Sequence, residues 1–328
     1  MILAAATVSL VLGENGIIAR AQDATNKTNE ATKNEQNALA DLDAHIGEAL
    51  GETPPAKPGQ ISNTNSQYTD SEGKTVIIPG GFGVSEETSE QKVSDGLVIK
   101  DSSGNEFIWI PCTIDGANGT VKYEKWCTTG IAYNNSGISN DTLPSGVSSE
   151  EEQITKYGGF YIAKYEAGIP DSLSTAQTTA NATTRNVSGV PISKQNAVPW
   201  NYINYTNAKA NAESMYSSGS VQSGLLTGTM WDTVMKWLQN AGYSVTDSTA
   251  WGNYNNAPVT NITEYSTNYE RWLTASSVTK GTSTSWLLKT GHSKYTEANN
   301  IYDLAGNMYE WTNEIFSSGR VYRGRQLQ

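Results

Sequence analysis

A cluster of prolines at residues 54–59, Pro54-Pro55-Ala56-Lys57-Pro58-Gly59, divides the chain into two unlike parts. Proline has no amide hydrogen to donate and restricts the residue before it, so no helix continues through this cluster. Before it, over residues 17–50, small and apolar residues recur every three or four positions, which is the period of a helix. We therefore predict a long N-terminal helix within residues 1–53, then a separate strand-rich region.

The first residues add a second constraint on this helix. Met1–Leu12 is an apolar run of 12 residues, shorter than the ~20 that a helix needs to cross a bilayer. The basic leader and cleavage site of a signal peptide are not evident. The helical stripe is mostly Ala and Thr, so the helix is expected to be marginal without a partner helix or a membrane.

Composition narrows the class of protein. Hydrophobic residues make up 37% and charged residues 17%, and the chain holds 9 Trp and 17 Tyr, so it has ample aromatic area for a core. The formal net charge is -11 and no cluster of Lys or Arg interrupts it. Because a phosphate-binding surface needs concentrated positive charge, we expect no nucleic-acid partner.

After the prolines, residues 54–73 are predicted to be a linker and residues 74–153 a β-rich region. Alternating β-branched and aromatic residues at 96–100 and 106–111 flank Asp101-Ser102-Ser103-Gly104-Asn105, which predicts a hairpin. The Asn-, Ser- and Gly-rich segment 130–153 is predicted to be a surface loop.

The two cysteines, Cys112 and Cys127, are a candidate disulfide. The turn-forming residues 115–119 between them favour a hairpin that would bring the thiols together. Two unpaired, partly buried thiols are the alternative. With only two histidines, far apart in sequence, a zinc site or a Cys/His nucleophile pair is not expected.

A short acidic segment near the C-terminus is the main candidate site. Asp303 and Glu310 are seven positions apart around Gly306-Asn307, so their carboxylates can converge on one cation together with backbone carbonyls. Ligation by oxygen alone suits calcium. In the alternative reading, the two carboxylates bond backbone amides of the turn. Trp311 and Tyr309 are expected to fill core space.

The same segment carries a family resemblance. Residues 301–314, Ile-Tyr-Asp-Leu-Ala-Gly-Asn-Met-Tyr-Glu-Trp-Thr-Asn-Glu, and residues 320–324, Arg-Val-Tyr-Arg-Gly, resemble the signature of the formylglycine-generating, sulfatase-modifying-factor family, whose fold is a variant of the C-type lectin fold. Residues 158–166, 199–202 and 224–238 resemble further elements of that domain in the same order, including a helix capped by Thr227. The resemblance implies an α+β, C-type-lectin-like domain over 154–328, truncated at its C-terminus because family members continue past the arginine–glycine element.

The resemblance also assigns roles to residues. It implies a structural calcium ion held by side-chain oxygens of Asp303 and Glu310 and the carbonyls of Gly306 and Met308. It implies no catalysis, because the copper-binding cysteine pair of the enzymes follows the arginine–glycine element, where this chain ends, and the iron-binding relatives need several histidines. Asp303 stands where the family usually has Asn.

A third branch of the fold contains ligand-binding proteins, among them the variable proteins of diversity-generating retroelements. Aromatic residues among small polar ones suit adaptable recognition, so Trp251, Tyr254, Tyr269 and Trp272 are candidates for a ligand face. Ordinary loops of an Asn- and Tyr-rich chain are the alternative. Residues 13–24 resemble the membrane-proximal end of the N-terminal helix of prepilin-like proteins, although the usual leader and processing site are missing.

We therefore expect a non-catalytic bacterial surface protein that binds an extracellular protein or glycan, with possible pilus or membrane association through its N-terminal helix. An incomplete formylglycine-generating oxidoreductase and a structural pseudopilin are the two alternatives.

Overall fold

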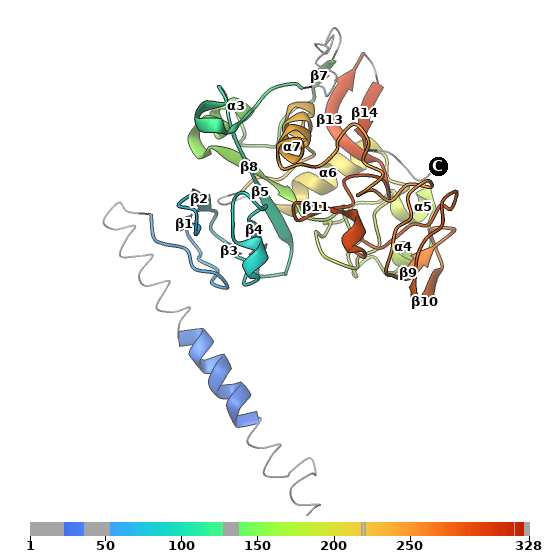
Figure 1. The fold of residues 1–328 in the computed structure, drawn as a ribbon, viewed down its shortest axis with the longest axis horizontal. Helices are drawn as coiled ribbons and strands as arrows, with labels where there is room; N and C mark the ends of the chain where they lie inside the picture. Colours follow the sequence, from blue (N-terminus) through green and yellow to red (C-terminus); the bar gives the residue numbers. More distant parts are fainter. Residues whose placement is uncertain are drawn as a thin grey trace, which may run out of the picture.

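The computed structural model describes residues 23–35, 53–126, 138–217, 219, 221–317 and 319–324. Helices and strands are mixed throughout the region after residue 53, which confirms the predicted α+β class (Figure 1).

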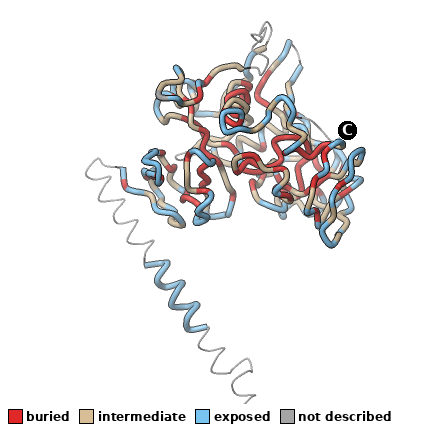
Figure 2. The backbone as a smooth tube through the Cα atoms, in the orientation of Figure 1, coloured by how far each residue is buried: buried red, intermediate tan, exposed pale blue. Residues whose placement is uncertain are grey.

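The N-terminal helix is described only over residues 23–35, where every residue is exposed (Figures 1 and 2). A helix of the predicted length is not seen, and the rest of the prediction, on residues 1–22 and 36–52, lies outside the described residues. Among the described helices, none combines the length and the apolar character needed to cross a membrane.

A central sheet contains the strands that form the predicted hairpin. Strands β3 (Phe82–Val84), β4 (Val98–Asp101) and β5 (Glu106–Thr113) follow one another, and β8 (Gly159–Ala163) pairs antiparallel with β5. The turn between β4 and β5 closes because the Asp101 carboxylate accepts a hydrogen bond from the Asn105 amide at 2.8 Å. The structure confirms this hairpin, and β8 lies within residues 158–166, the segment that resembles the family domain.

The segment after β5 differs from the predicted hairpin. Strand β6 (Val121–Lys122) pairs with β5 in parallel, with Cys112 beside Val121, so the prediction of a hairpin around residues 115–119 was wrong. The Thr113 hydroxyl accepts a hydrogen bond from the Ala117 amide, and the 3-10 helix η2 (Ala117–Gly119) curls the chain back before it rejoins β5 in the same direction. Cys127 lies outside the described residues.

Part of the predicted linker is a strand. Strand β1 (Ser66–Thr69) pairs antiparallel with β2 (Thr75–Ile78), so the linker predicted over 54–73 is shorter than expected. Alternation explains it, since Ser66 and Tyr68 point inward while Gln67 and Thr69 face solvent. Likewise, part of the loop predicted over 130–153 is regular structure, because β7 (Ile138–Asn140) and the start of α3 (Glu150–Tyr157) fall within it.

Helices cover the sheet. The predicted helix start at Thr227 is confirmed, because its hydroxyl accepts a hydrogen bond from the Met230 amide at 3.2 Å and caps α7. Helix α7 spans Gly228–Asn240. The other α-helices after α3 are α4 (Ser174–Thr178), α5 (Ala182–Arg185) and α6 (Tyr205–Met215). The largest apolar core lies between α7 and one face of β5 and β8, and a second cluster covers the other face.

The remaining strands form small sheets. Strand β13 (Glu310–Phe316) lies between β7 and β14 (Gly319–Arg323), β9 (Ile262–Ser266) pairs with β10 (Trp272–Val278), and β11 (Glu297–Ala298) pairs with β12 (Ile301–Tyr302). The short 3-10 helices are η1 (Thr88–Glu90) and η3 (Lys294–Thr296). The predicted acidic segment therefore connects β12 to β13.

Candidate binding cavity and acidic turn

The turn between β12 and β13 has an unusual backbone. Asp303, Gly306 and Asn307 have φ values of 61°, 84° and 58°, in the left-handed region that favours glycine. A Cβ on Gly306 would lie 2.4 Å from the Asn253 carbonyl oxygen, so the close approach of these two backbones requires glycine here. The turn is thereby fixed against the segment around residue 253.

Asn307 is the hub of the turn and is fully buried. Its side-chain oxygen accepts hydrogen bonds from the Leu288 amide and from Asn253 Nδ2, each at 3.0 Å. Its Nδ2 donates to Glu166 Oε2 at 2.7 Å, and the Met308 amide donates to the other oxygen of Glu166 at 3.0 Å. Glu166 therefore belongs to the site, although the sequence analysis gave it no role beyond the resemblance of residues 158–166 to the family domain.

Asp303 is engaged within the protein. Its Oδ2 accepts a hydrogen bond from the Gly291 amide at 2.6 Å, and its Oδ1 accepts one from the Thr296 hydroxyl at 2.7 Å. Burial raises the pKa of Asp303 to about 6, and these two donors act in the opposite direction. Asp303 therefore bonds an amide and a hydroxyl beyond its own turn.

Glu310 is in the opposite situation. Both of its carboxylate oxygens are buried and have no hydrogen-bond partner in the structure. Burial raises the pKa of Glu310 well above its usual value, and the nearby carboxylates of Glu166 and Asp303 add to the effect. A buried carboxylate without partners is costly, so this group needs either a proton or a cation.

The surroundings of Glu310 fit a hard cation better than those of Asp303 do. An ideal Cβ on Gly324 would lie 2.2 Å from Glu310 Oε2 and 3.5 Å from the Met308 carbonyl oxygen, so both oxygens border the space that this glycine leaves free. No group of three or more His, Cys, Asp or Glu side chains that could bind a metal is found among the described residues. A calcium ion would thus depend on carbonyl oxygens and water as well as on Glu310.

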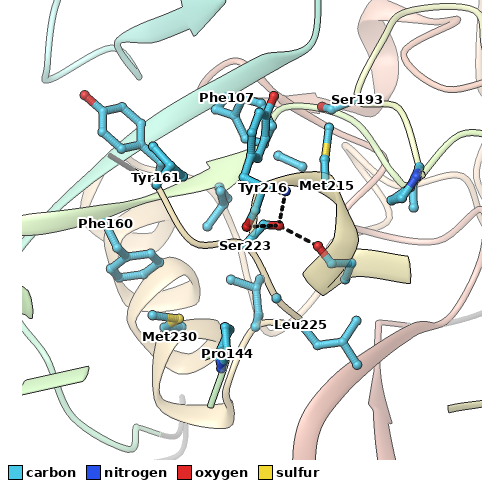
Figure 3. A pocket seen from close by; sticks show the side chains of 18 of the residues that line it. Phe107, Pro144, Phe160, Tyr161, Ser193, Met215, Tyr216, Ser223, Leu225 and Met230 are labelled. Atoms are coloured by element: carbon cyan, nitrogen blue, oxygen red, sulfur yellow. Dashed lines mark hydrogen bonds between the residues drawn. The ribbon is translucent and has the colours of Figure 1, made fainter. Parts of the chain in front are cut away.

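A cavity of about 770 Å³ lies beside the turn (Figure 3). It falls within the ~300–1,000 Å³ that is usual for ligand pockets. Residues 159–163 of β8, one side of α6, the segment 221–227 and residues 308–311 of the acidic turn all contribute to its wall. Its aromatic lining includes Phe107, Trp109, Phe160, Tyr161, Tyr216 and Trp311. We call this space the aromatic cavity.

The charges that line the aromatic cavity have one sign. Three charged side chains are found among its described lining residues, and all are glutamates: Glu150, Glu166 and Glu310. Glu150 accepts hydrogen bonds from the Tyr123 and Thr227 hydroxyls through Oε2, while its buried Oε1 has no partner. Burial raises the pKa of Glu150. The cavity is therefore apolar with an acidic character.

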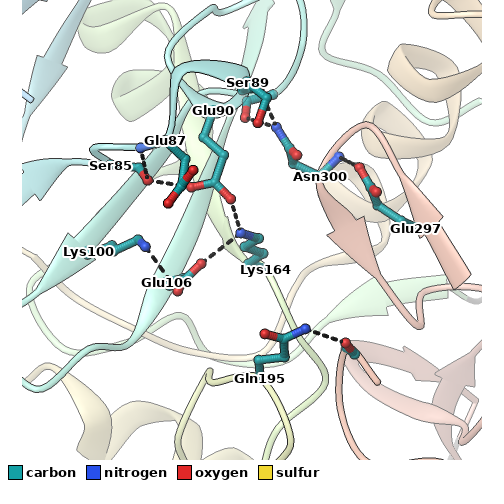
Figure 4. A network of polar contacts seen from close by, with 12 residues as sticks. Ser85, Glu87, Ser89, Glu90, Lys100, Glu106, Lys164, Gln195, Glu297 and Asn300 are labelled. Carbon is teal, nitrogen blue, oxygen red and sulfur yellow. Dashed lines mark hydrogen bonds and ion pairs between the residues drawn. The ribbon is translucent and has the colours of Figure 1, made fainter. Parts of the chain in front are cut away.

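A buried ion cluster holds the strand that leads into this site (Figure 4). Lys164, directly after β8, donates to Glu106 Oε2 at 2.7 Å and also to Glu90. Burial alone would lower the pKa of Lys164, but Glu106 and Glu90 outweigh it and raise the pKa. The carbonyl of Lys164 also accepts a hydrogen bond from the Tyr302 amide at 2.9 Å, which fixes the start of the acidic turn.

The four predicted ligand-face residues do not converge on the aromatic cavity. Trp251 and Tyr254 are each only 6% exposed and belong to the main core, which contradicts the expectation that they are exposed. Tyr269 is half-buried and contacts the ring of the exposed Tyr202 at 6.2 Å. Trp272 is half-buried, with the Lys289 ammonium 5.4 Å from its ring. The small polar residues around Trp251 and Tyr254 predicted exposed loops, but packing against residues distant in sequence buries both side chains.

Cys112 lies on β5 and is fully buried. Burial raises the pKa of its thiol to about 12, which disfavours the reactive thiolate. Its predicted pairing with Cys127 falls outside the described residues.

Comparison of the chain with protein-family models, with curated proteins and with solved structures found no match.

Proposed function

We propose that this protein is a non-catalytic surface protein that binds an extracellular ligand in the aromatic cavity, on a lectin-like scaffold stiffened by calcium. The observation that carries the proposal is the cavity itself, about 770 Å³ in volume and lined by aromatic side chains from segments far apart in the sequence. Rigid aromatic rings supply large contact area at a low cost in conformational entropy.

The lectin-like scaffold and the surface location rest on the sequence resemblance. Calcium at the acidic turn is supported by the two partnerless oxygens of Glu310 and by the Met308 carbonyl beside them. A bound cation would supply the missing counter-charge and tie β13 to the turn. Asp303, already held by Gly291 and Thr296, would orient the turn.

Binding in the aromatic cavity is tested with Nile red, a neutral dye whose fluorescence rises in apolar surroundings. Ala212 lines the cavity from α6, so Ala212→Trp should fill it and weaken dye binding about tenfold, the effect of a loss of ~1.4 kcal/mol. Ala210 lies on the exposed side of the same helix, so Ala210→Trp is the matched control and should bind the dye normally. Equal dye binding by both variants, or no binding by the parent protein, would reject the proposal.

The calcium component is tested by thermal unfolding with added calcium and with chelator. Because a ligand that binds only the folded state stabilises it, the midpoint should rise with calcium concentration. Glu310→Gln should remove this dependence, whereas Glu270→Gln, at an exposed position, should retain it. An unchanged midpoint for the parent protein would count against calcium without affecting the dye result.

A further inference from the structure

The outer edge of β8 is unpaired in the described part of the chain. Strand β8 pairs on one side only, with β5. The Glu106 carbonyl accepts from the Lys164 amide and the Cys112 amide donates to Gly158, so even-numbered residues of both strands point their backbone groups at each other. The N–H and C=O groups of the odd-numbered residues of β8 therefore point outward.

The aromatic cavity runs along this free edge. Successive side chains of a strand point to opposite faces of its sheet. Phe160 and Ile162 belong to one face and Tyr161 and Ala163 to the other, yet all four line the same cavity. A space that contacts both faces of a strand lies at its edge. Figure 3 shows Phe160 and Tyr161 pointing to opposite sides of the strand that carries them.

The walls beyond the edge are apolar above and below it. The rings of Phe107 and Tyr216 pack together, with their centroids 5.7 Å apart, on the same side of β8 as Tyr161 (Figure 3). Met230 lies on the other side of β8, with Phe160. A strand inserted here would bury side chains on both faces, as an inner strand of a sheet does.

We propose that an extended peptide, apolar in the middle and basic at its ends, adds as a strand to the outer edge of β8. This inference rests on the proposed function and names its ligand class. The outward N–H and C=O groups of Gly159, Tyr161 and Ala163 supply the main-chain hydrogen bonds, and the aromatic cavity takes the alternating side chains. The described lining residues include no Lys or Arg, and the partnerless Oε1 of Glu150 can accept a hydrogen bond from a basic side chain. A second copy of this chain is disfavoured because its net charge is -11.

The probe is the fluorescently labelled peptide acetyl-Arg-Val-Ile-Val-Ile-Arg-amide, whose six residues span roughly 20 Å at ~3.3 Å each and so cover the five residues of β8. Two further peptides carry N-methyl groups on backbone amides of the inner residues. One is methylated on the two valines and the other on the two isoleucines, which are the two alternating sets of amides. Strand addition uses only one set of amides, so one methylated peptide should bind at least tenfold more weakly and the other like the parent. A glutamate-ended peptide should also bind weakly.

The protein-side variant is Ala163→Pro, which removes an outward amide and leaves the pairing with β5 intact. It should weaken peptide binding at least tenfold, while Ala163→Val, which keeps the amide, should bind the peptide normally. Equal binding of the two methylated peptides, with the dye still bound, would overturn strand addition but not the proposed function. Without peptide, hydrogen-exchange protection of the Tyr161 and Ala163 amides, or a dimer that Ala163→Pro dissociates, would show the edge already occupied and would also overturn it.

Discussion

Replacing Lys164 by Met should destabilise the fold strongly, because this one ammonium binds two carboxylates, Glu90 and Glu106, and Glu106 alone of the two also pairs with Lys100, at 3.3 Å. The side chain of Lys164 is 5% exposed, and those of Glu90 and Glu106 are 11% and 16% exposed. The 2.7 Å contact with Glu106 corresponds to ~6 kcal/mol of attraction at an effective dielectric constant of ~20. Desolvation of the buried ions offsets much of this in the parent protein. Removal of the lysine leaves the desolvation uncompensated, so we expect a loss of about 3–5 kcal/mol.

The effect should depend on pH in a defined direction. Burial raises the pKa of Glu90, but Lys164 and Ser85 outweigh it, so the pKa is lowered in the parent protein. A lowered pKa contributes stability above the ordinary glutamate range that is lost as the pH falls through the folded-state value. In Lys164→Met, Glu90 loses the ammonium that lowers its pKa, so the pKa of Glu90 should rise. Protonation then relieves the variant, so its deficit should be largest near neutral pH and shrink below about pH 5.

Urea unfolding followed by tryptophan fluorescence measures this deficit. The control is Lys92→Met, since Lys92 pairs with Glu72 at 3.1 Å but both side chains are 41% exposed, so solvent screening keeps the loss small. The triple variant Lys164→Met, Glu90→Gln and Glu106→Gln should recover most of the stability, because no buried charge remains unpaired. The reasoning is refuted if Lys164→Met costs no more than Lys92→Met at neutral pH.

Three further changes have a predicted sign. Gly228→Ala should lower the unfolding free energy by about 2 kcal/mol, because the new Cβ would lie 1.8 Å from Glu314 Oε1. This clash outweighs the ~1 kcal/mol that alanine gains over glycine in helix propensity. Denaturant titration measures the change in unfolding free energy. Asn307→Ala should cost about 3 kcal/mol, since it removes a donor from Glu166 and breaks the hub of the turn; Asn307→Asp should be no better, because it places another carboxylate against Glu166. Thr227→Ala should cost about 1 kcal/mol through the lost cap, and Thr227→Ser should restore it in the same titration.

Local signals in the sequence predicted the local elements well. The turn residues 101–105, the alternation after them and the capping threonine at residue 227 each involve contacts over a few positions, and the structure confirms all three elements. Propensity also separated the helical N-terminal segment from the strands that follow the prolines. Strand β1 was missed because it is short and one of its two inward-facing residues, Ser66, is polar.

The candidate site was predicted only in part, because its partners come from distant segments. Asp303 and Glu310 were identified from their spacing, but Glu166, 141 positions before Asn307, carried no signal beyond the resemblance of residues 158–166 to the family domain. The burial of Trp251 and Tyr254 was likewise invisible in a loop rich in small polar residues. A cavity wall assembled from segments far apart in the sequence has no counterpart in local sequence.

One chain of contacts connects the features of this site. Lys164 is held by Glu106 and Glu90, its carbonyl receives the Tyr302 amide, and two residues later Glu166 binds the acidic turn. The strand before Lys164 is β8, whose other edge borders the aromatic cavity. A loosened ion cluster should therefore shift both the turn and the free edge of β8. Lys164→Met, measured where it remains folded, should weaken both calcium stabilisation and peptide binding, whereas Lys92→Met should alter neither.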